Sequence, residues 1–277
     1  MTARVSLTTS PAPAPDGSCP ALAVHELSAG YRDAPHAVEN VTFAVGHGER
    51  VGVVGPNGAG KSTLFKAIAG LIPHHTGYIS LCGEDCATSH TLIGYVPQQD
   101  AIDWSFPVTV RDVVMMGRVR QIGWLRFPSR RDWETVDALL ARVGMLDCRH
   151  RQIGQLSGGQ RRRVFIARAL AQQTDVLLLD EPFSGVDAAA EEEILATLDL
   201  LRAEGVTVIL ATHDMRLAAS RFDKLLLLNR RVIAFGAADQ VFRPELLEQA
   251  YGGRIGIFHE GERTLFIVDD HGGPDGG

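Results

Sequence analysis

Residues 55–63 read Gly-Pro-Asn-Gly-Ala-Gly-Lys-Ser-Thr, and this stretch decides the fold of the chain. A short apolar run at 51–54 precedes it, and residues 64–68 continue with helical spacing. Strand, glycine loop and helix in this order form the context in which G-x-x-x-x-G-K-[ST] is a phosphate-binding loop. Glycines let backbone N–H groups converge on phosphate oxygens, and a helix N-terminus favours an anion. The stretch therefore predicts an α/β fold that binds a nucleotide.

The residues of this loop are candidate ligands of a nucleoside triphosphate. We expect Lys61 to reach the β- and γ-phosphates and the hydroxyl of Ser62 to ligate Mg²⁺. A glycine-rich turn before an ordinary helix is the alternative, and it leaves the complete motif and its flanks unexplained. The predicted nucleotide ligands in the loop are Gly55, Pro56, Asn57, Gly58, Ala59, Gly60, Lys61, Ser62 and Thr63.

A second apolar run, at 176–179, ends in the adjacent carboxylates Asp180 and Glu181. Asp180, at the end of the expected strand, would hold Mg²⁺ through water, and Glu181 would polarise a water in line with the γ-phosphate. The alternative is an acidic turn after a buried strand. Together with the phosphate loop, the two carboxylates predict a site that hydrolyses a nucleoside triphosphate.

The composition narrows the class of protein. With 277 residues, of which 45% are hydrophobic, the chain can bury a substantial core in one large α/β domain or two small ones. The net charge of −6 argues against a nucleic-acid partner. No apolar run approaches the length of about 18 residues that a membrane span needs. The N-terminus also lacks an export signal, so we expect a soluble, cytoplasmic chain.

Candidate transition-metal ligands are few and badly spaced. The four cysteines are too scattered for a disulfide framework, and Cys82 and Cys86 have no second pair nearby. His74 and His75 are adjacent, which rarely allows both to chelate one ion, and His271 stands in a polar tail. We therefore expect reduced thiols and no transition-metal site.

The pattern of hydrophobicity divides the chain into segments. Residues 1–20 are expected to form a disordered leader and residues 251–277 a C-terminal extension with a polar tail. Helical spacing predominates at 108–173, which predicts a helical insertion in an α/β core. Strands are expected within 22–54 and at 77–81, 93–96, 176–179 and 206–210, a hairpin at 225–235, and further helices at 61–70 and 188–203.

A third motif, Leu156-Ser-Gly-Gly-Gln160, precedes another helix. Small residues and a hydroxyl at a helix N-terminus form a second anion site, which suggests two such sites facing each other across a dimer. With these motifs the chain resembles the nucleotide-binding subunit of an ATP-binding-cassette (ABC) transporter over residues 22–250. The resemblance implies a P-loop NTPase core: a RecA-like parallel sheet, an N-terminal antiparallel β region and a helical insertion at 100–173 that carries the signature segment, residues 156–160.

The resemblance also implies how ATP is bound. Two identical subunits close head to tail, so that the phosphate loop of one and the signature segment of the other enclose ATP and Mg²⁺. Tyr31 matches the aromatic residue that stacks on adenine, although an ordinary half-buried tyrosine is the alternative. Asp187 matches the aspartate between the subunits. The signature residues expected to contact the partner's ATP are Ser157, Gly158, Gly159 and Gln160.

Two more matches complete the expected catalytic set. Gln98, after Tyr95-Val-Pro97, resembles the glutamine that touches Mg²⁺ and the attacking water and relays closure to the membrane subunits. His213, in Ala211-Thr-His-Asp214, resembles the histidine that holds the γ-phosphate. The expected catalytic residues are Glu181, His213 and Gln98, and the expected Mg²⁺ ligands are Ser62, Gln98 and Asp180.

One departure from the family pattern points to a subfamily. Where the family has Ser-Ala-Leu-Asp, this chain has Ser184-Gly-Val-Asp187, a form similar to that of importers of manganese, zinc and chelated iron. The stretch 95–118, with Asp103-Trp104, resembles the same subfamily.

The resemblance implies an ATPase that energises metal import at the cytoplasmic face of the membrane. Its partners would be permease subunits and, indirectly, a secreted or periplasmic metal-binding protein. We expect residues 103–107 to lie in the permease groove, with packing inside the helical insertion as the alternative.

Other functions stay open as alternatives. A siderophore importer or an exporter would use the same ATPase motifs. A soluble ABC ATPase acting on ribosomes or DNA would carry two cassettes or a long coiled coil. This chain has one phosphate loop and no sustained heptad run. A phosphoryl-transfer kinase would need an acceptor site and would leave the signature segment unexplained.

Overall fold

The main sheet of the protein is mostly parallel. The computed structural model describes residues 19–85, 93–98, 106–123, 125–252, 255–260 and 263–268. The strand order is β10-β9-β3-β8-β7-β6, and only β10 runs antiparallel to its neighbour. This arrangement confirms the predicted α/β core. The strands are β3 (Arg50–Val54), β6 (Ile93–Val96), β7 (Val176–Asp180), β8 (Thr207–Ala211), β9 (Lys224–Asn229) and β10 (Arg231–Gly236).

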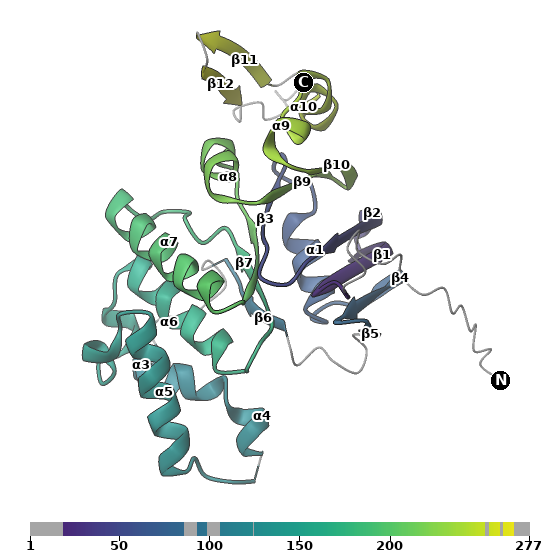
Figure 1. Cartoon of the computed structure of the whole chain (residues 1–277). Coiled ribbons are helices and arrows are strands. Elements are labelled where there is room, and N and C mark those ends of the chain that lie inside the picture. The colour runs from purple at the N-terminus through teal and green to yellow at the C-terminus, as the bar shows by residue number, and fades with distance from the viewer. Residues whose placement is uncertain are drawn as a thin grey trace, which may run out of the picture.

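A second, antiparallel sheet lies beside the main one (Figure 1). The strand that ends at Val45 pairs with the strand that begins at Leu22, whereas the next strand, Arg50–Val54, belongs to the main sheet. The turn at 46–49 therefore leads from one sheet into the other and does not close a hairpin. Helix α1 (Lys61–Ile68) lies between the sheets, and its Leu64 and Phe65 share one apolar core with residues of both. The strands in order across this sheet are β2 (Ala34–Val45), β1 (Leu22–Tyr31), β4 (His74–Leu81) and β5 (Glu84–Asp85).

Helices cover the other face of the main sheet. Along β7 the side chains alternate: Val176 and Leu178 enter the core that contains α1, whereas Leu177 and Leu179 enter the core that contains α6. Helices α1 and α6 therefore cover opposite faces of the same sheet. The helices on the α6 side are α3 (Val110–Met116), α4 (Val119–Ile122), α5 (Arg130–Arg142), α6 (Gly158–Leu170) and α7 (Ala188–Ala203), with 3-10 turns at Leu146–Cys148 and Ile153–Gln155.

The starts of these helices are set by side-chain caps. Thr109 and Asp112 form a capping box at α3, and Ser129 and Asp132 form another at α5. Each box satisfies backbone N–H groups that a helix start leaves without a partner. Helix α7 begins after Asp187 and spans the range 188–203 that the sequence predicts.

The C-terminal part forms a third apolar core. Helices α8 (Met215–Arg221), α9 (Ala238–Val241) and α10 (Pro244–Tyr251) pack against β9 and the predicted hairpin that it makes with β10. Strands β11 (Ile255–Glu260) and β12 (Arg263–Val268) form another antiparallel hairpin, which the sequence analysis does not predict. Residues 1–18 of the expected leader and the tail 269–277 lie outside the described residues. Within the described part, no helix is long and apolar enough to cross a membrane.

Candidate active site

The phosphate loop, the residue after β7 and the segment after β6 meet at one cavity of about 330 Å³. These segments converge because β3, β7 and β6 are parallel strands of one sheet, so their carboxyl ends lie at the same edge. The cavity brings together residues as far apart in the chain as Ala37 and Glu181. Its lining consists of Ala37, Asn57, Gly58, Ala59, Gly60, Lys61, Ser62, Thr63, Gln98 and Glu181.

The phosphate loop is held in place by its own backbone and by Lys61. Gly60 has φ +95°, and a Cβ there would lie 2.6 Å from the carbonyl oxygen of Ala37, so only glycine fits. The Nζ atom of the buried Lys61 donates hydrogen bonds to the carbonyl oxygens of Gly55 (2.7 Å) and Pro56 (3.1 Å). Lys61 thus ties the end of the phosphate loop to its start.

Behind the loop, Asp180 links β7 to Ser62. The Ser62 hydroxyl donates to Oδ1 of Asp180 at 3.1 Å, and the Tyr95 hydroxyl donates to Oδ2 at 3.2 Å. Burial raises the pKa of Asp180, and the two hydrogen bonds partly offset this rise. Burial, with the charge of Asp180, raises the pKa of Tyr95 well above its usual value, so Tyr95 stays a neutral donor. The role of Tyr95 escapes sequence analysis because it depends on the pairing of β6 with β7.

Ser62 and Asp180 fit a Mg²⁺ site. A hydroxyl that donates its proton to Asp180 turns its lone pairs away from that carboxylate, as an oxygen ligand of Mg²⁺ must. Ser62 lines the cavity, and Asp180 does not, which suits direct contact for Ser62 and contact through water for Asp180. Gln98 adds a further oxygen to the same cavity.

Glu181 has an unusual backbone. Its φ of +47° lies in the left-handed region, which costs about 1 kcal/mol for a residue with a Cβ. Its N–H donates to the carbonyl oxygen of Ala211 at 3.1 Å, and its carbonyl oxygen accepts from the N–H of Ser184 at 3.2 Å. These two bonds hold the strained residue with its side chain at the cavity. Strain of this kind is typical of functional positions.

His213 follows a strand of the main sheet and Tyr31 ends a strand of the second sheet, and neither residue lines the cavity. His213 follows β8, which runs between β3 and β7, and its side chain is exposed. The next residue, Asp214, caps α8 by accepting from the N–H groups of Arg216 and Leu217. Tyr31 ends β1, is 42% exposed, and has the Nζ of Lys66 at 5.9 Å from its ring centroid.

The signature segment lies on the opposite side of the sheet. Ser157 caps α6: its Oγ accepts from the N–H of Gln160 at 3.3 Å, and Oε1 of Gln160 accepts from the N–H of Ser157 at 3.1 Å. A Cβ at Gly159 would lie 2.5 Å from the Cβ of Ala190, whereas one at Gly158 would meet nothing closer than 3.8 Å. No residue of 157–160, all of them described, lines the phosphate-loop cavity.

The segment 184–187 contacts α6 and leads into α7, and its backbone accounts for the glycine at 185. Gly185 has φ +70°, a conformation that the usual alanine adopts only with strain. Asp187 caps α7, with its Oδ1 accepting from the N–H of Ala190 at 2.8 Å. The buried Arg162 of α6 donates to the carbonyl oxygen of Ser184. The signature helix and the exposed Asp187 are thus tied into one unit.

Some sequence predictions fall outside the described structure. Asp103, Trp104 and Ser105 are not described, whereas Phe106 is 62% exposed. Cys86 and His271 are likewise outside it. The described residues contain no group of three or more His, Cys, Asp or Glu arranged to hold a metal ion.

Comparisons with known proteins agree with this geometry. Residues 38–184 match the ABC transporter family. The chain is 49% identical to the manganese transport system ATP-binding protein MntB of Bacillus subtilis, over 79% of this chain and 87% of that protein. It is 44% identical to the zinc transport system ATP-binding protein TroB of Treponema pallidum, over 85% and 88%. In structure it resembles a chain of an inward-facing ABC transporter described as of the metal-chelate type. That match has a TM-score of 0.77 and 29% identity, over 90% of this chain and 97% of the other.

The chain therefore belongs to the ABC transporter family. It carries the ATPase domain of that family, which binds and hydrolyses ATP.

Proposed function

We propose that this chain is the ATP-hydrolysing subunit of an ABC importer for transition-metal ions: manganese, zinc or iron. The observation that carries the proposal is the high identity, over most of the chain, to the ATP-binding proteins of a manganese and a zinc transport system. Gly185 and Val186 also replace the Ala-Leu of the general family pattern, and this form is similar to that of the metal-importing subfamily. Gly185 has a left-handed backbone conformation.

The cavity of the phosphate loop is the ATP site in this proposal. Backbone N–H groups at the start of α1 and the ammonium group of Lys61 bind the phosphates, and the ring of Tyr31 stacks on adenine. Lys61 exchanges its two carbonyl acceptors in the loop for phosphate oxygens. Mg²⁺ held by Ser62, Gln98 and, through water, Asp180 would neutralise charge on the β- and γ-phosphates.

Hydrolysis then depends on a water aligned with the γ-phosphate. Glu181, fixed at the cavity by its backbone bonds, accepts a proton from that water, and Gln98 orients it. His213, at the end of the neighbouring strand, donates to the γ-phosphate. All three groups stand at the carboxyl edge of adjacent parallel strands, so one small closure can align them.

A second copy of the chain completes the site. The cavity contains donors for the phosphates on one side, and the signature segment of the same chain covers the other face of the sheet. In a head-to-tail homodimer, the start of α6 in one copy meets the ATP held by the other, and ATP binding closes the dimer. Asp187, exposed at the start of α7, lies at the same interface.

The membrane partner is a permease, and the site for it lies next to Gln98. A cavity of about 520 Å³ separates the end of α1 from α3 and α4, and exposed apolar side chains of Leu71, Met116 and Val119 line it. Tyr95, which binds Asp180, lines the same cavity. A short permease helix seated there would contact the strand that leads to Gln98. Docking of this kind holds the subunit at the cytoplasmic face of the membrane.

Metal uptake in cells tests the proposal. Deleting the gene should abolish high-affinity uptake of manganese, zinc or iron, measured separately with labelled ions. The wild-type gene and the Glu248→Gln control, on the exposed face of α10, should restore uptake, and Glu181→Gln should not. If uptake of all three ions is unchanged by the deletion, the metal-import proposal is wrong and the siderophore or exporter alternative takes its place.

A further inference from the structure

The loop between α4 and α5 exposes two large apolar side chains. Leu125 is 95% exposed and Phe127 is 96% exposed, far more than the other exposed large apolar side chains of the described structure. Single exposed apolar residues are normal, but two at full exposure within three positions form a candidate contact surface. The described residues around this pair, 121–123 and 125–131, are called the helical tip below.

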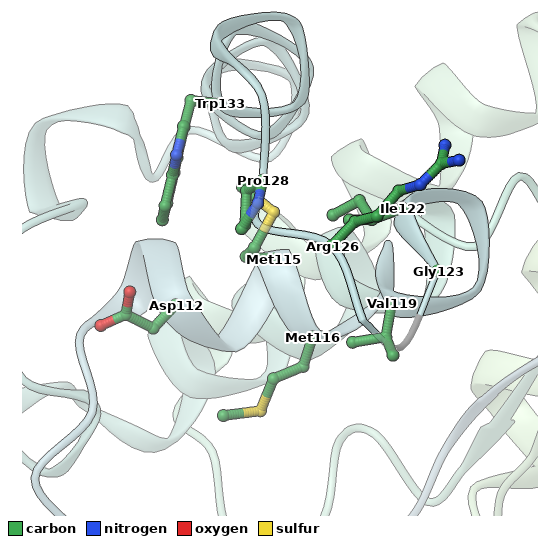
Figure 2. Close-up of a pocket in the computed structure, with 9 residues that line it drawn as sticks. All are labelled: Asp112, Met115, Met116, Val119, Ile122, Gly123, Arg126, Pro128 and Trp133. Carbon is green, nitrogen blue, oxygen red and sulfur yellow. The ribbon is translucent and has the colours of Figure 1, made fainter.

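A place to bury these side chains lies next to them. An apolar cavity of about 410 Å³ opens between α3, α4 and α5. Figure 2 shows Ile122 and Arg126 on one side of it and Trp133 on the other. Leu125 and Phe127 are not among the residues that line it, although Gly123, Arg126 and Pro128 around them are. The chain thus passes along the cavity, and neither Leu125 nor Phe127 is buried in it.

The charge of this region is the reverse of that of the chain. Between positions 113 and 131 there are five arginines and no aspartate or glutamate, whereas the whole chain has a net charge of −6. Arg118 pairs with Asp132 at 2.9 Å, and Arg130 pairs with Glu134 at the surface. For Arg120, Arg126 and Arg131, all exposed, the described residues supply no ion pair.

We propose that the helical tip binds the surface of a membrane that contains anionic phospholipids. Leu125 and Phe127 enter the boundary between headgroups and acyl chains, and the exposed Arg126 and Arg131 lie against the phosphates. Protruding apolar side chains with a basic surround are the arrangement that binds such surfaces. The proposal rests on the proposed function in one respect, since a transporter subunit works beside a membrane.

The shape of the tip favours a membrane over a protein partner. Leu125 and Phe127 protrude beside exposed arginines, so apolar insertion and binding of anionic headgroups can occur at one flat surface. In Figure 1, α4 and α5 lie at the opposite end of the molecule from the hairpin of β11 and β12. The cavity proposed for the permease includes Met116 of α3 and Val119 of α4, so a docked permease brings this end toward the bilayer.

Vesicle binding by the full chain tests the proposal. The protein should sediment with vesicles of phosphatidylcholine that contain about a third phosphatidylglycerol, and not with phosphatidylcholine alone. Leu125→Ser with Phe127→Ser should lower the partition coefficient at least roughly tenfold. Arg126→Gln with Arg131→Gln should lower it by about fivefold or more per arginine, and added salt should also lower it for the wild type. The matched controls are Leu200→Ser on α7 and Arg216→Gln on α8, both exposed, which should bind as the wild type does.

Each outcome separates the tip from the rest of the molecule. ATP hydrolysis without vesicles should be equal for the wild type and the tip variants, since these residues lie outside the ATP cavity. The proposal is overturned if the wild type does not bind anionic vesicles, or if the tip variants bind as it does. Loss of permease binding by the tip variants without any vesicle binding would identify a protein contact and also overturn it. Metal uptake lost on gene deletion tests the importer separately, so the two can fail independently.

Discussion

The phosphate loop and the signature segment are two glycine-containing helix starts that end differently. At α1, Gly60 stands at the cap position and no side chain caps the helix, so its first N–H groups face the cavity. At α6, Ser157 and Gln160 cap each other's backbone. At the start of α1, N–H groups without a side-chain cap face the cavity, where an anion can bind them. At the start of α6, the capping box satisfies the N–H groups of Ser157 and Gln160 within the chain.

The phosphate-loop half and the signature half of the site are also stabilised differently. The phosphate-loop half contains a buried lysine, a buried aspartate and a strained glutamate, which suit ligand binding more than folding. The signature half packs against α7 at Ala190 and is tied to Ser184 by Arg162. Substitutions in the phosphate-loop half should therefore lower ATPase activity. Substitutions in the signature half should also lower the free energy of unfolding.

The largest effect is expected at the phosphate-loop half. Glu181→Gln keeps the shape of the side chain but removes the base, so ATP hydrolysis should fall by roughly 10²–10⁴ while ATP still binds. An ATP-bound homodimer should accumulate, as seen by size-exclusion chromatography alongside phosphate release. Turnover equal to that of the wild type would remove Glu181 from its proposed role.

The signature half is probed by its two neighbouring glycines. Gly159→Ala forces a Cβ to 2.5 Å from Ala190 and should destabilise the isolated chain by about 1–3 kcal/mol. Gly158→Ala, with 3.8 Å of room, is the matched control and should leave the chain about as stable as before. Urea unfolding of both variants measures the difference. Equal unfolding midpoints would show that α6 does not depend on close packing against α7.

The smallest effect concerns the rim of the cavity. Tyr31→Ala should weaken ATP and GTP binding by a similar amount, about 1–3 kcal/mol, because stacking depends little on the base. Tyr31→Phe keeps the ring and should retain affinity. Calorimetric titration of the four combinations measures this, and an unchanged affinity of Tyr31→Ala would return the residue to ordinary packing.

The sequence predicts the local parts of this structure well. The strand, loop and helix at 50–68 and helix α7 follow from motif and periodicity alone, and both are observed. The convergence of Gln98 with Glu181 in one cavity was implied only through the family resemblance, because it depends on the strand order. The roles proposed for the site residues and the domain boundaries stay predictions.

What the sequence misses depends on contacts between distant residues. The bond from Tyr95 to Asp180 needs β6 beside β7, and the clash at Gly159 needs α6 against α7. The hairpin of β11 and β12 follows a region assigned only as an extension, because pairing of two short runs is set by register and not by local preference. The capping box of Ser157 was readable: a serine followed three residues later by glutamine is its pattern.

The central claim is that the signature segment of one copy completes the phosphate-loop cavity of the other. Mixing Lys61→Ala chains with Ser157→Arg chains tests it most directly. In a head-to-tail heterodimer, one site carries both changes and the other carries neither. In a site built within one chain, every site would be damaged.

The account predicts that two proteins, each inactive alone, regain partial ATPase activity when mixed. The activity should rise with the fraction of heterodimer, measured with differently tagged chains. If heterodimers are shown to form and no ATPase activity returns, the head-to-tail arrangement is contradicted.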